Sequence, residues 1–314
     1  MHSGVSTVAL DALGVLRARG PDALSFLQGQ LSNDLTRLSG DRSLLAGYHN
    51  PQGRVIAVLR VLQLAPEDLL AVLPRELVAT VIARLSKFIL RAKVKLVDDS
   101  LAWRINGLLA GADADADGSA ADRAVASLVA ALPPAVDSVA HIADAVAVQV
   151  ARQPSRWLLL TPATRSPPAD ATTAPPIWRR GAIAAGEPEV YAATSGEFLA
   201  QMLNLDALGA IAFDKGCYTG QEVIARAHYR GRVKRRMQRF VAAAPQALKP
   251  GDAGTLADGR AFKVVDAVQR ADGRCEFLAV APLIEGDSAP PVPEAISGER
   301  LAVETLPLPY PLPS

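Results

Sequence analysis

The sequence is poor in cysteine, and this scarcity limits the chemistry available to the chain. Its 314 residues include only two cysteines, Cys217 and Cys275, and these do not form a Cys-x-x-Cys pair. A disulfide framework is therefore not expected, and a reducing compartment fits the composition. Two thiols cannot supply the four thiolates of a common iron–sulfur site. Any link to a cluster would have to run through partner proteins or through a shared, transient site.

Metal-ligand spacing, strong net charge and long apolar runs are also missing. The four histidines (His2, His49, His141 and His228) are scattered, so no metal site is predicted. A formal net charge of +1 gives no global attraction to nucleic acid or to a membrane. The N-terminus does not have the basic and then apolar profile of a signal peptide, and no apolar run reaches membrane-spanning length. We therefore expect a soluble, cytoplasmic protein with no membrane partner.

The sequence does contain one short stretch that is dense in chemistry, from Lys215 to Glu222. It reads Lys-Gly-Cys-Tyr-Thr-Gly-Gln-Glu, and it combines a cation, a thiol, a phenol, an amide and a carboxylate with two glycines. Its second half fits the capping box Ser/Thr-x-x-Glu, and the apolar pair Val223 and Ile224 follows directly. The pattern therefore predicts a helix that begins near Thr219.

Cys217 would then lie just before the N-terminus of this helix. The free N–H groups and the dipole of a helix favour negative charge there, and Lys215 adds a cation two residues away. Both features favour the reactive thiolate. Gly216 and Gly220 would allow the backbone to turn tightly and to approach another group closely. The pattern fits a pre-activated cysteine in a ligand-facing loop, but also a buried structural cysteine at a tight turn.

The run from Lys215 to Arg226, Lys-Gly-Cys-Tyr-Thr-Gly-Gln-Glu-Val-Ile-Ala-Arg, resembles the signature of the YgfZ-type folate-binding family. Members of this family are linked to iron–sulfur cluster maintenance and to tRNA modification, and they are relatives of the glycine-cleavage aminomethyltransferase (T-protein). The resemblance covers nearly the whole chain, because shorter motifs follow in the family's order at 26–34, 50–54, 90–94, 186–188, 201–205, 229–235 and 306–310. The octapeptide is highly specific, whereas the shorter motifs are persuasive mainly by their order.

The resemblance implies an α+β fold. An aminomethyltransferase-like folate-binding region of two interwoven subdomains would span residues 1–232, and a C-terminal antiparallel β barrel would span residues 233–314. The sequence after residue 237 agrees with this, since short β-prone runs are separated by the hairpin signals Asp258-Gly259 and Asp272-Gly273. Cys275 lies within one of these strand patterns, so we expect it to be a plain core residue.

Two groups of site residues follow from the resemblance. Cys217 would be the reactive group, activated by Lys215 and by the helix start. The surrounding loop would be formed by Gly216, Tyr218, Gly220, Gln221 and Glu222, while Arg226 would bind an anion or brace the loop. Tetrahydrofolate or another folate would be bound by Gln28, Gln30, Asn33, Asn50, Arg91, Trp178 and Tyr229. No metal is expected to be bound by the chain alone.

Several of the folate-binding assignments have a plain structural alternative. Gln28, Gln30 and Asn33 could hydrogen-bond an amide-rich ring such as a pterin, or they could simply be solvated. Basic and apolar residues alternate over 91–96, as in a strand with one wet face. That basic face could meet the glutamate tail of folate or be a solvated edge. Trp178 could stack on a flat heterocycle or be an ordinary core tryptophan.

Three positions depart from the pattern of the family, and they bear on whether the chain is an enzyme. Relatives that transfer an aminomethyl group carry an acidic residue in the strand after the Gln-Gly turn, and this position is Ala57 here. The glutamate that would hydrogen-bond the amino group of the pterin falls on Ala184, and a second expected aromatic falls on Leu13. The change at Ala57 argues against aminomethyl transfer, and the change at Ala184 argues against high folate affinity.

The leading hypothesis is a tetrahydrofolate-dependent accessory factor for the assembly or repair of iron–sulfur enzymes. Its partners would be a folate and iron–sulfur client or assembly proteins. The first alternative is a folate-dependent one-carbon (aminomethyl) transferase. The second is an RNA-binding module that uses a wholly basic run, which contains Arg226, Arg230, Arg232, Lys234, Arg235, Arg236 and Arg239. Because the net charge is close to zero, nucleic acid is the weaker of the expected partners.

Overall fold

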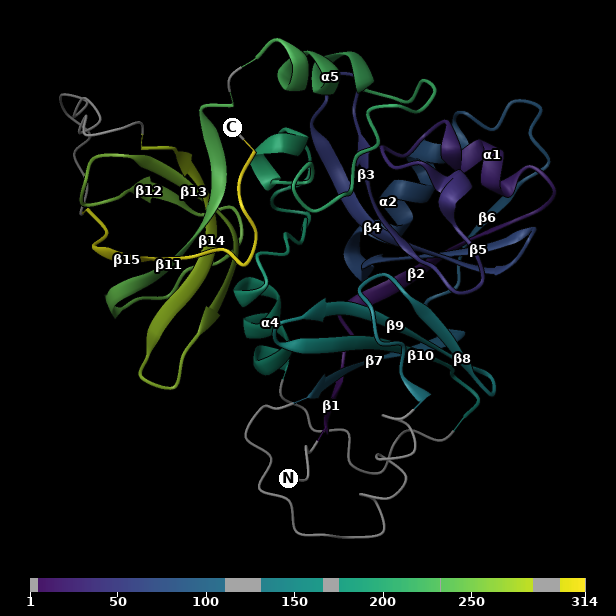
Figure 1. Cartoon of the computed structure of the whole chain (residues 1–314), viewed down its shortest axis with the longest axis horizontal. Coiled ribbons are helices and arrows are strands. Elements are labelled where there is room, and N and C mark those ends of the chain that lie inside the picture. The colour runs from purple at the N-terminus through teal and green to yellow at the C-terminus, as the bar shows by residue number, and fades with distance from the viewer. Residues whose placement is uncertain (1–4, 111–130, 166–174, 232, 285–299, 314) are drawn as a thin grey trace, which may run out of the picture.

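A computed structural model describes residues 5–110, 131–165, 175–231, 233–284 and 300–313. Within these ranges the strands form three antiparallel sheets, each of five strands (Figure 1). Short helices accompany them, so the fold mixes helix and strand and is mostly β. This confirms the helix-and-strand class expected from the sequence.

The first sheet has the strand order β3-β4-β5-β2-β6. Its strands are β2 (Leu13–Arg19), β3 (Leu44–His49), β4 (Val55–Ala65), β5 (Asp68–Pro74) and β6 (Lys95–Asp98). Three helices belong to the same part of the chain: α1 (Ala23–Gln28), η1 (Leu35–Arg37) and α2 (Arg75–Ser86). α2 buries one face, which carries Leu77, Val78, Val81 and Leu85 at helical spacing.

The alternating run 91–96 was expected to be one strand, and this expectation is wrong for its first four residues. β6 begins only at Lys95, and the residues before it bond to the start of α1 instead. The N–H of Lys93 donates to Oδ2 of Asp22 at 2.6 Å, and the carbonyl of Lys93 accepts from the N–H of Asp22 at 3.3 Å. These backbone groups are therefore not available for a strand ladder, and Arg91 is exposed on the connecting segment.

The second sheet has the order β1-β7-β10-β9-β8. Its strands are β1 (Val5–Ala9), β7 (Trp103–Ala110), β8 (Val139–Ile142), β9 (Ala145–Arg152) and β10 (Ser155–Pro162). β1 pairs with β7 and not with β2, although only residues 10–12 separate β1 from β2. The chain thus enters the second sheet, builds the whole first sheet and then returns, so the two sheets are interwoven.

The third sheet follows, with the order β12-β13-β14-β11-β15. Its strands are β11 (Arg235–Pro245), β12 (Ala253–Thr255), β13 (Ala261–Gln269), β14 (Arg274–Pro282) and β15 (Val303–Leu306). Both predicted hairpin turns place their glycine in the left-handed region, at φ 87° for Gly259 and 78° for Gly273. The side chain of Cys275 is fully buried, as expected. An isolated bridge joins Leu256 to Leu301 near the two edge strands, and a closed barrel with a boundary at 232/233 remains a prediction.

The segment between the second and third sheets joins the molecule together. It comprises α4 (Pro175–Ala184), a stretch rich in turns that contains η2 (Ala200–Leu203), and α5 (Gln221–Tyr229). One buried apolar cluster combines Leu59 of the first sheet, Phe198 of this segment and Val265 of the third sheet.

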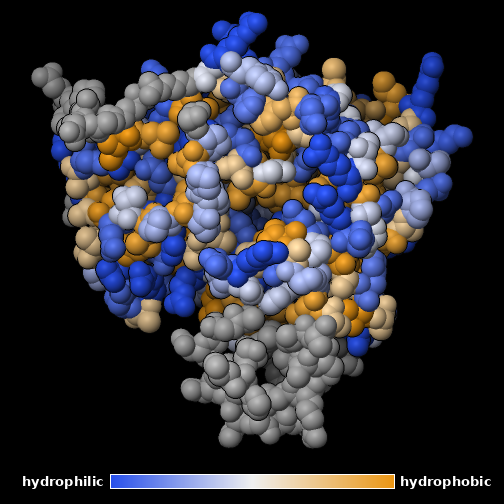
Figure 2. All heavy atoms as spheres, viewed as in Figure 1, coloured by the Kyte–Doolittle hydropathy of each residue, from blue (hydrophilic) through white to orange (hydrophobic). Residues whose placement is uncertain are grey.

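Figure 2 shows that the face seen in Figure 1 mixes hydrophilic and hydrophobic residues. None of the helices in the described ranges is long and apolar enough to cross a membrane.

Candidate functional site

The loop that carries Cys217 leads directly into α5, near the top of Figure 1. α5 begins at Gln221, and its N-cap is Gly220 in the left-handed conformation, at φ 84°. No side chain caps this end, so the predicted capping box at Thr219 is wrong. Because the helix starts after Gly220, Glu222 occupies the second helical position rather than the third, where it would close the box.

Gly220 makes the close approach expected of it. A Cβ atom at this position would lie 2.6 Å from the carbonyl oxygen of Asn50 and 3.0 Å from Cα of Gly53. A Cβ atom on Gly53 would in turn lie 3.0 Å from Cβ of Val223. The 50–53 turn between β3 and β4 therefore packs backbone to backbone against the start of α5. Oδ1 of Asn50 accepts the N–H of Arg54 at 2.9 Å, so this amide serves the turn itself.

Lys215 reaches away along the loop to the end of α1. Its Nζ donates to the carbonyl oxygens of Gln28, Leu31 and Asn33 at 2.6, 2.7 and 2.8 Å. Burial lowers the pKa of Lys215 to about 8, and the charge of Asp34 opposes that shift. All three N–H bonds of the ammonium group have carbonyl partners, so this cation clamps the loop to the segment after α1.

Cys217 itself is exposed, so the alternative of a buried structural cysteine is wrong. Gly216 beside it has no heavy atom within 4 Å of where its Cβ would be, so the backbone there faces open space. Glu222, Arg226 and Tyr229 are also exposed, on α5. The thiol is therefore accessible to a partner molecule, on a loop whose neighbours Lys215 and Gly220 hold it in place.

Two aromatic rings are buried beside this loop, and one of them belongs to a histidine that the sequence analysis did not single out. Burial raises the pKa of Tyr218 to about 12, and its ring centroid lies 6.2 Å from that of His49. Burial lowers the pKa of His49 to about 3. Within the described part of the chain, neither ring nitrogen of His49 has a hydrogen-bond partner. A Cβ atom on Gly47 would lie 2.5 Å from Cε1 of His49, so this glycine makes room for the ring.

The amides predicted to bind folate near α1 are bonded within the protein. Nε2 of Gln28 donates to Asp34 at 2.9 Å, and its Oε1 accepts the N–H of Leu35 at 2.7 Å. Nδ2 of Asn33 donates to the carbonyl oxygens of Leu45 and Gly209. These side chains therefore shape the segment that Lys215 clamps. Oε1 of Gln30 is buried without a partner among the described residues.

The basic run after α5 is divided between surface and interior. Arg236 is buried in a double ion pair with Asp206, with both N–O distances at 2.9 Å. Arg239 is bonded to the buried Glu276 at 2.6 Å. Arg226, Arg230, Lys234 and Arg235 are exposed, and Arg232 lies outside the described residues. The prediction of a continuous basic strip that is free to bind a partner is therefore wrong for Arg236 and Arg239.

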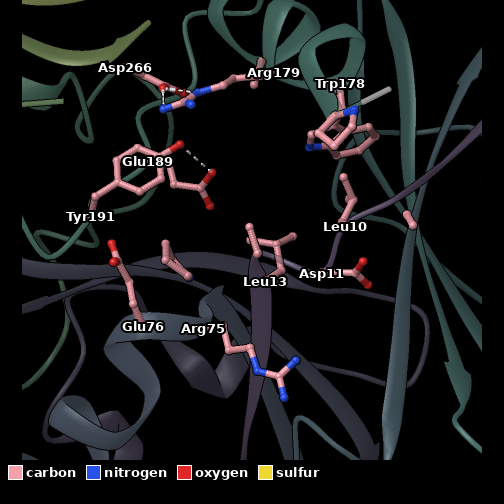
Figure 3. A pocket seen from close by; sticks show the side chains of 15 residues that line it. Leu10, Asp11, Leu13, Arg75, Glu76, Trp178, Arg179, Glu189, Tyr191 and Asp266 are labelled. Atoms are coloured by element: carbon pink, nitrogen blue, oxygen red, sulfur yellow. Dashed lines mark hydrogen bonds and ion pairs between the residues drawn. The ribbon is translucent and has the colours of Figure 1, made fainter. Parts of the chain in front are cut away.

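A cavity of about 660 Å³ lies where the three sheets meet (Figure 3). Its walls come from the β1–β2 connection at 9–13, the start of α2, α4, the stretch at 189–191 and β13. The side chains around it that carry polar groups or rings are Asp11, Arg75, Glu76, Trp178, Arg179, Glu189, Tyr191 and Asp266. A smaller cavity of about 110 Å³ adjoins it and shares Leu13, Trp178, Ala182 and Glu189. Of the residues predicted to bind folate, Trp178 alone lines these two cavities, and Cys217 lines neither.

Trp178 presents only part of its indole to the cavity. The guanidinium of the fully buried Arg156 lies 4.7 Å from the centroid of the ring. A Cβ atom on Gly107 would lie 2.3 Å from Cε3 of the indole, so the ring occupies the space that this glycine leaves. Nη2 of Arg156 donates to Glu187 at 2.5 Å. With one face of the indole covered by a cation, a flat ligand could stack only on the other.

The opposite wall holds a cluster of polar side chains from two parts of the fold. Arg179 of α4 pairs with Asp266 of β13, and its guanidinium lies 5.1 Å from the ring centroid of Tyr191. The hydroxyl of Tyr191 donates to Oε2 of Glu189 at 3.2 Å. Burial raises the pKa of Glu189 to about 7, the charge of Asp266 adds to that shift, and the bond from Tyr191 opposes it. Burial also raises the pKa values of Tyr191 and Asp266.

These side chains were missed in the sequence, although two weak signals were present. Glu189 and Tyr191 are two residues apart, a spacing that places both side chains on the same side wherever the backbone is extended. Asp266 is a lone acid within the apolar strand β13. Neither signal alone distinguishes a cavity wall from an ordinary surface or an internal ion pair.

A continuous stretch of chain links the cavity to the loop of Cys217. After Tyr191, the N–H of Ala192 donates to Glu76 at 2.7 Å. Further along, Oγ of Ser195 donates to the carbonyl of Ile56, and the carbonyl of Phe198 accepts the N–H of Val55, both at 2.8 Å. The 50–53 turn against Gly220 comes next. Because Leu13 pairs with Pro74 and β4 runs antiparallel to β5, the cavity and the turn lie at the same end of the first sheet.

Among the described residues, no group of three or more histidine, cysteine, aspartate or glutamate side chains is placed to hold a metal ion.

Comparison with solved structures gives the fold. The aminomethyltransferase T of the glycine cleavage system from Bartonella henselae superposes with a TM-score of 0.64. The match covers 90% of this chain and 79% of that chain, at 13% sequence identity. The fold is therefore aminomethyltransferase-like.

Comparison with known sequences gives the family, although no family model matches the chain. The chain is 31% identical over 322 residues to the tRNA-modifying protein YgfZ of Klebsiella pneumoniae (strain 342), a match that covers 98% of this chain and 94% of that protein. It is 30% identical over 256 residues to the tRNA-modifying protein YgfZ of Pectobacterium carotovorum subsp. carotovorum (strain PC1), covering 78% of this chain and 73% of that protein. The chain therefore belongs to the YgfZ family.

Proposed function

We propose that this protein is a tetrahydrofolate-binding accessory factor for the assembly or repair of iron–sulfur enzymes, and that Cys217 is its reactive group. The observation that carries the proposal is the combination of an exposed thiol on a fixed loop with a ligand-sized cavity at the same end of the first sheet. A link to tRNA would follow if the served enzymes modify tRNA, as the names of the relatives suggest.

The cavity suits a folate in size and in chemistry. Its volume of about 660 Å³ lies within the usual range for small-molecule sites. Leu10, Leu13 and Trp178 would contact the flat ring (Figure 3). Arg75, which is exposed at the start of α2, would meet a carboxylate of the glutamate tail at the edge of the cavity. Bound tetrahydrofolate would supply a carrier for one-carbon units on N5 of its reduced ring and on the neighbouring linker nitrogen, N10.

The chain lacks the carboxylate that aminomethyl transfer would require in β4. Ala57 occupies that position and is fully buried. A transferase would need a charged group beside the folate there, and a methyl group cannot supply it. This supports the accessory role over the transferase alternative.

Cys217 is proposed to act as a nucleophile or as a temporary ligand to iron on a partner protein. Lys215 would keep the loop in place through its three carbonyl bonds, and Gly220 would fix the start of α5. Tyr218, Gln221, Glu222 and Arg226 would form the surface and the support around the thiol. Because the described residues include no group of three or more potential metal ligands, a cluster bound by Cys217 would have to be shared with the partner.

The role of Cys217 is tested by complementation of a strain that lacks the factor. Cys217→Ala should abolish rescue of iron–sulfur enzyme activity, whereas Cys275→Ala, a change in the core of the third sheet, should rescue to the extent that the variant folds. Full rescue by Cys217→Ala would refute the role of the thiol.

Folate binding is tested by titrating the pure protein with tetrahydrofolate while tryptophan fluorescence is followed. A saturable change that disappears in Trp178→Phe, with binding still detected by calorimetry, would place the ligand beside this indole. A lack of any saturable binding would refute the folate proposal.

A second candidate, RNA binding, is favoured by a cluster of rings at the end of α5. The ring of His228 stacks on Phe213 with 3.7 Å between centroids, and Tyr229 meets His228 edge-on at 4.7 Å. Tyr229 is 67% exposed, and Arg226 and Arg230 are exposed on the same helix end. Exposed rings among cations are typical of surfaces on which bases stack. RNA affinity that falls steeply with salt and is reduced by Tyr229→Ala would support this function, and salt-insensitive or absent binding would dismiss it.

A further inference from the structure

The cavity between the three sheets carries more negative than positive groups. Its walls include four carboxyls (Asp11, Glu76, Glu189 and Asp266) but two guanidinium groups (Arg75 and Arg179). Asp266 is paired with Arg179, Glu76 accepts the N–H of Ala192, and Asp11 is exposed. Glu189 is therefore the carboxyl best placed to meet a ligand inside the cavity.

The position of Glu189 suits such contact. Oε2 accepts the hydroxyl of Tyr191 at 3.2 Å, which orients the carboxyl group. Figure 3 shows the other oxygen directed into the space between Tyr191, Leu13 and Trp178. Glu189 also lines the smaller cavity, so its side chain lies where the two spaces join.

A carboxylate in this position selects a particular kind of ligand edge. Its oxygens accept hydrogen bonds and donate none, so the ligand must present N–H groups. Two adjacent N–H groups in one plane match the two oxygens, as a guanidinium does in bidentate pairs. The ring N–H and the neighbouring amino group of a reduced pterin have this arrangement. The glutamate tail of a folate carries only carboxylates at its end, and Glu189 would repel it.

We propose that Glu189, held by Tyr191, recognises the edge of a reduced pterin that carries the amino group and the neighbouring ring N–H. This inference rests on the folate-binding function proposed above and assigns the contact to a residue. Ala184, at the end of α4, has no polar side chain for this purpose. Ala182, two residues earlier, lines the cavity, and the chain after α4 brings Glu189 back to it.

Proton release should accompany this recognition. Burial raises the pKa of Glu189 to about 7 in the free protein, and the N–H groups of the ligand favour the ionised form. Affinity should therefore rise as the pH increases towards 7 and level off above it. The ionisable groups that face Glu189 or share its cavity are Tyr191, Asp266, Arg179, Glu187, Asp11, Arg75 and Glu76.

Calorimetry with three probes tests the assignment: tetrahydrofolate, 6-methyltetrahydropterin as the ring alone, and p-aminobenzoylglutamate as the tail alone. At pH 8 we expect Glu189→Gln to weaken binding of both ring-containing probes by about tenfold or more, because the amide donates towards the N–H groups. In Glu189→Gln, the proton release that accompanies ligand binding at pH 6.5 should disappear. It is measured by calorimetry in buffers of different ionisation enthalpy. Tyr191→Phe should weaken binding by a smaller factor. Glu67→Gln, in the exposed β4–β5 turn, is the matched control and should change neither quantity.

The outcomes separate this inference from the proposed function. If the wild type binds tetrahydrofolate and Glu189→Gln binds it equally well with the same proton release, the inference is overturned and the folate proposal stands. Binding of the tail probe without the ring probe would also overturn it. If the wild type binds none of the three probes, the inference and the folate proposal fail together. A thermal melt of each variant confirms that it is folded, and Tyr191→Phe tests the same contact should Glu189→Gln not fold.

Discussion

The cavity and the loop of Cys217 are built in opposite ways. In the cavity, side chains from all three parts of the fold converge, and burial shifts the pKa values of Glu189, Tyr191 and Asp266. In the loop, the thiol is exposed and backbone groups fix the position of the loop. Three backbone carbonyls accept hydrogen bonds from Lys215, and Gly220 packs closely against Asn50. Under the proposed function, the cavity would recognise a small ligand and the loop would present a reactive group to a large partner.

The largest expected effect is the difference in alkylation rate between the exposed thiol of Cys217 and the buried thiol of Cys275. Cys217 is open to solvent, whereas Cys275 is fully buried in the third sheet and reacts only when that sheet opens. With opening free energies near those of global unfolding, the two rates should differ by at least about a thousandfold. Mass spectrometry after timed iodoacetamide treatment measures both rates, with Cys217→Ser and Cys275→Ser to assign them. Comparable rates in the native protein would contradict the fold of this sheet.

Gly220→Ala tests whether the loop is held by backbone packing. The new Cβ would lie 2.6 Å from the carbonyl oxygen of Asn50, in a backbone with φ of +84°. We expect a loss of about 2–4 kcal/mol in unfolding free energy, from the combined clash and backbone strain. Gly216→Ala is the matched control, because its Cβ meets nothing within 4 Å. Urea unfolding measures the unfolding free energy of both variants. Equally small losses in the two variants would contradict the claim that backbone packing holds the loop.

His49 should make the region of the loop sensitive to acid. Burial places its folded-state pKa at about 3, below the value of about 6.5 for an unfolded histidine. Its contribution to stability is therefore complete above pH 6.5 and is lost as the pH falls towards 3. Between pH 7 and pH 5 we expect a loss of about 2 kcal/mol, from roughly 1.5 pKa units.

Replacement of this ring gives the control. His49→Phe should remove most of the loss, while His141→Gln, at an exposed histidine, should keep it. Urea unfolding of the three proteins at both pH values would decide, and an unchanged acid sensitivity in His49→Phe would contradict the burial of the ring.

Glu189 should give the cavity the opposite and smaller pH dependence. Its folded-state pKa of about 7 lies above the ordinary 4.5, so ionisation costs more in the folded state. The ligand-free protein should lose stability as the pH rises from 4.5 to 7 and remain level above that. Because the side chain is only half-buried, we expect about 1–2 kcal/mol. Glu189→Gln should therefore be more stable than the wild type at pH 8 but not at pH 4, as measured by urea unfolding. Equal stability of the two proteins at pH 8 would contradict the raised pKa of this carboxyl group.

Local chemistry was enough to predict parts of the third sheet. The buried Cys275 and the two Asp-Gly hairpins follow from short patterns with few structural solutions, whereas the sequence left the exposure of Cys217 open. The capping box failed because a glycine in the left-handed conformation takes the N-cap position from Thr219. When the second residue of the Ser/Thr-x-x-Glu pattern is glycine, either the first residue or the glycine can be the N-cap of the helix.

Long-range assembly could not be predicted in this way. Lys215 was placed beside Cys217 because the two are neighbours in sequence, but its long side chain reaches carbonyls of Gln28, Leu31 and Asn33 on a distant segment. The polar wall of the cavity combines Glu189 and Tyr191 with Asp266 from another sheet. Nothing in a single sequence fixes which face of the third sheet meets that stretch, so these residues could be named only once the sheets were positioned.

The separation of recognition from reactivity is tested most directly by the affinity for tetrahydrofolate of two variants, Cys217→Ala and Glu189→Gln. Calorimetry at pH 8 should give Cys217→Ala the affinity of the wild type and should show binding weakened about tenfold or more in Glu189→Gln. The reverse result, with binding lost in Cys217→Ala and kept in Glu189→Gln, would contradict the assignment of the cavity as the pterin site.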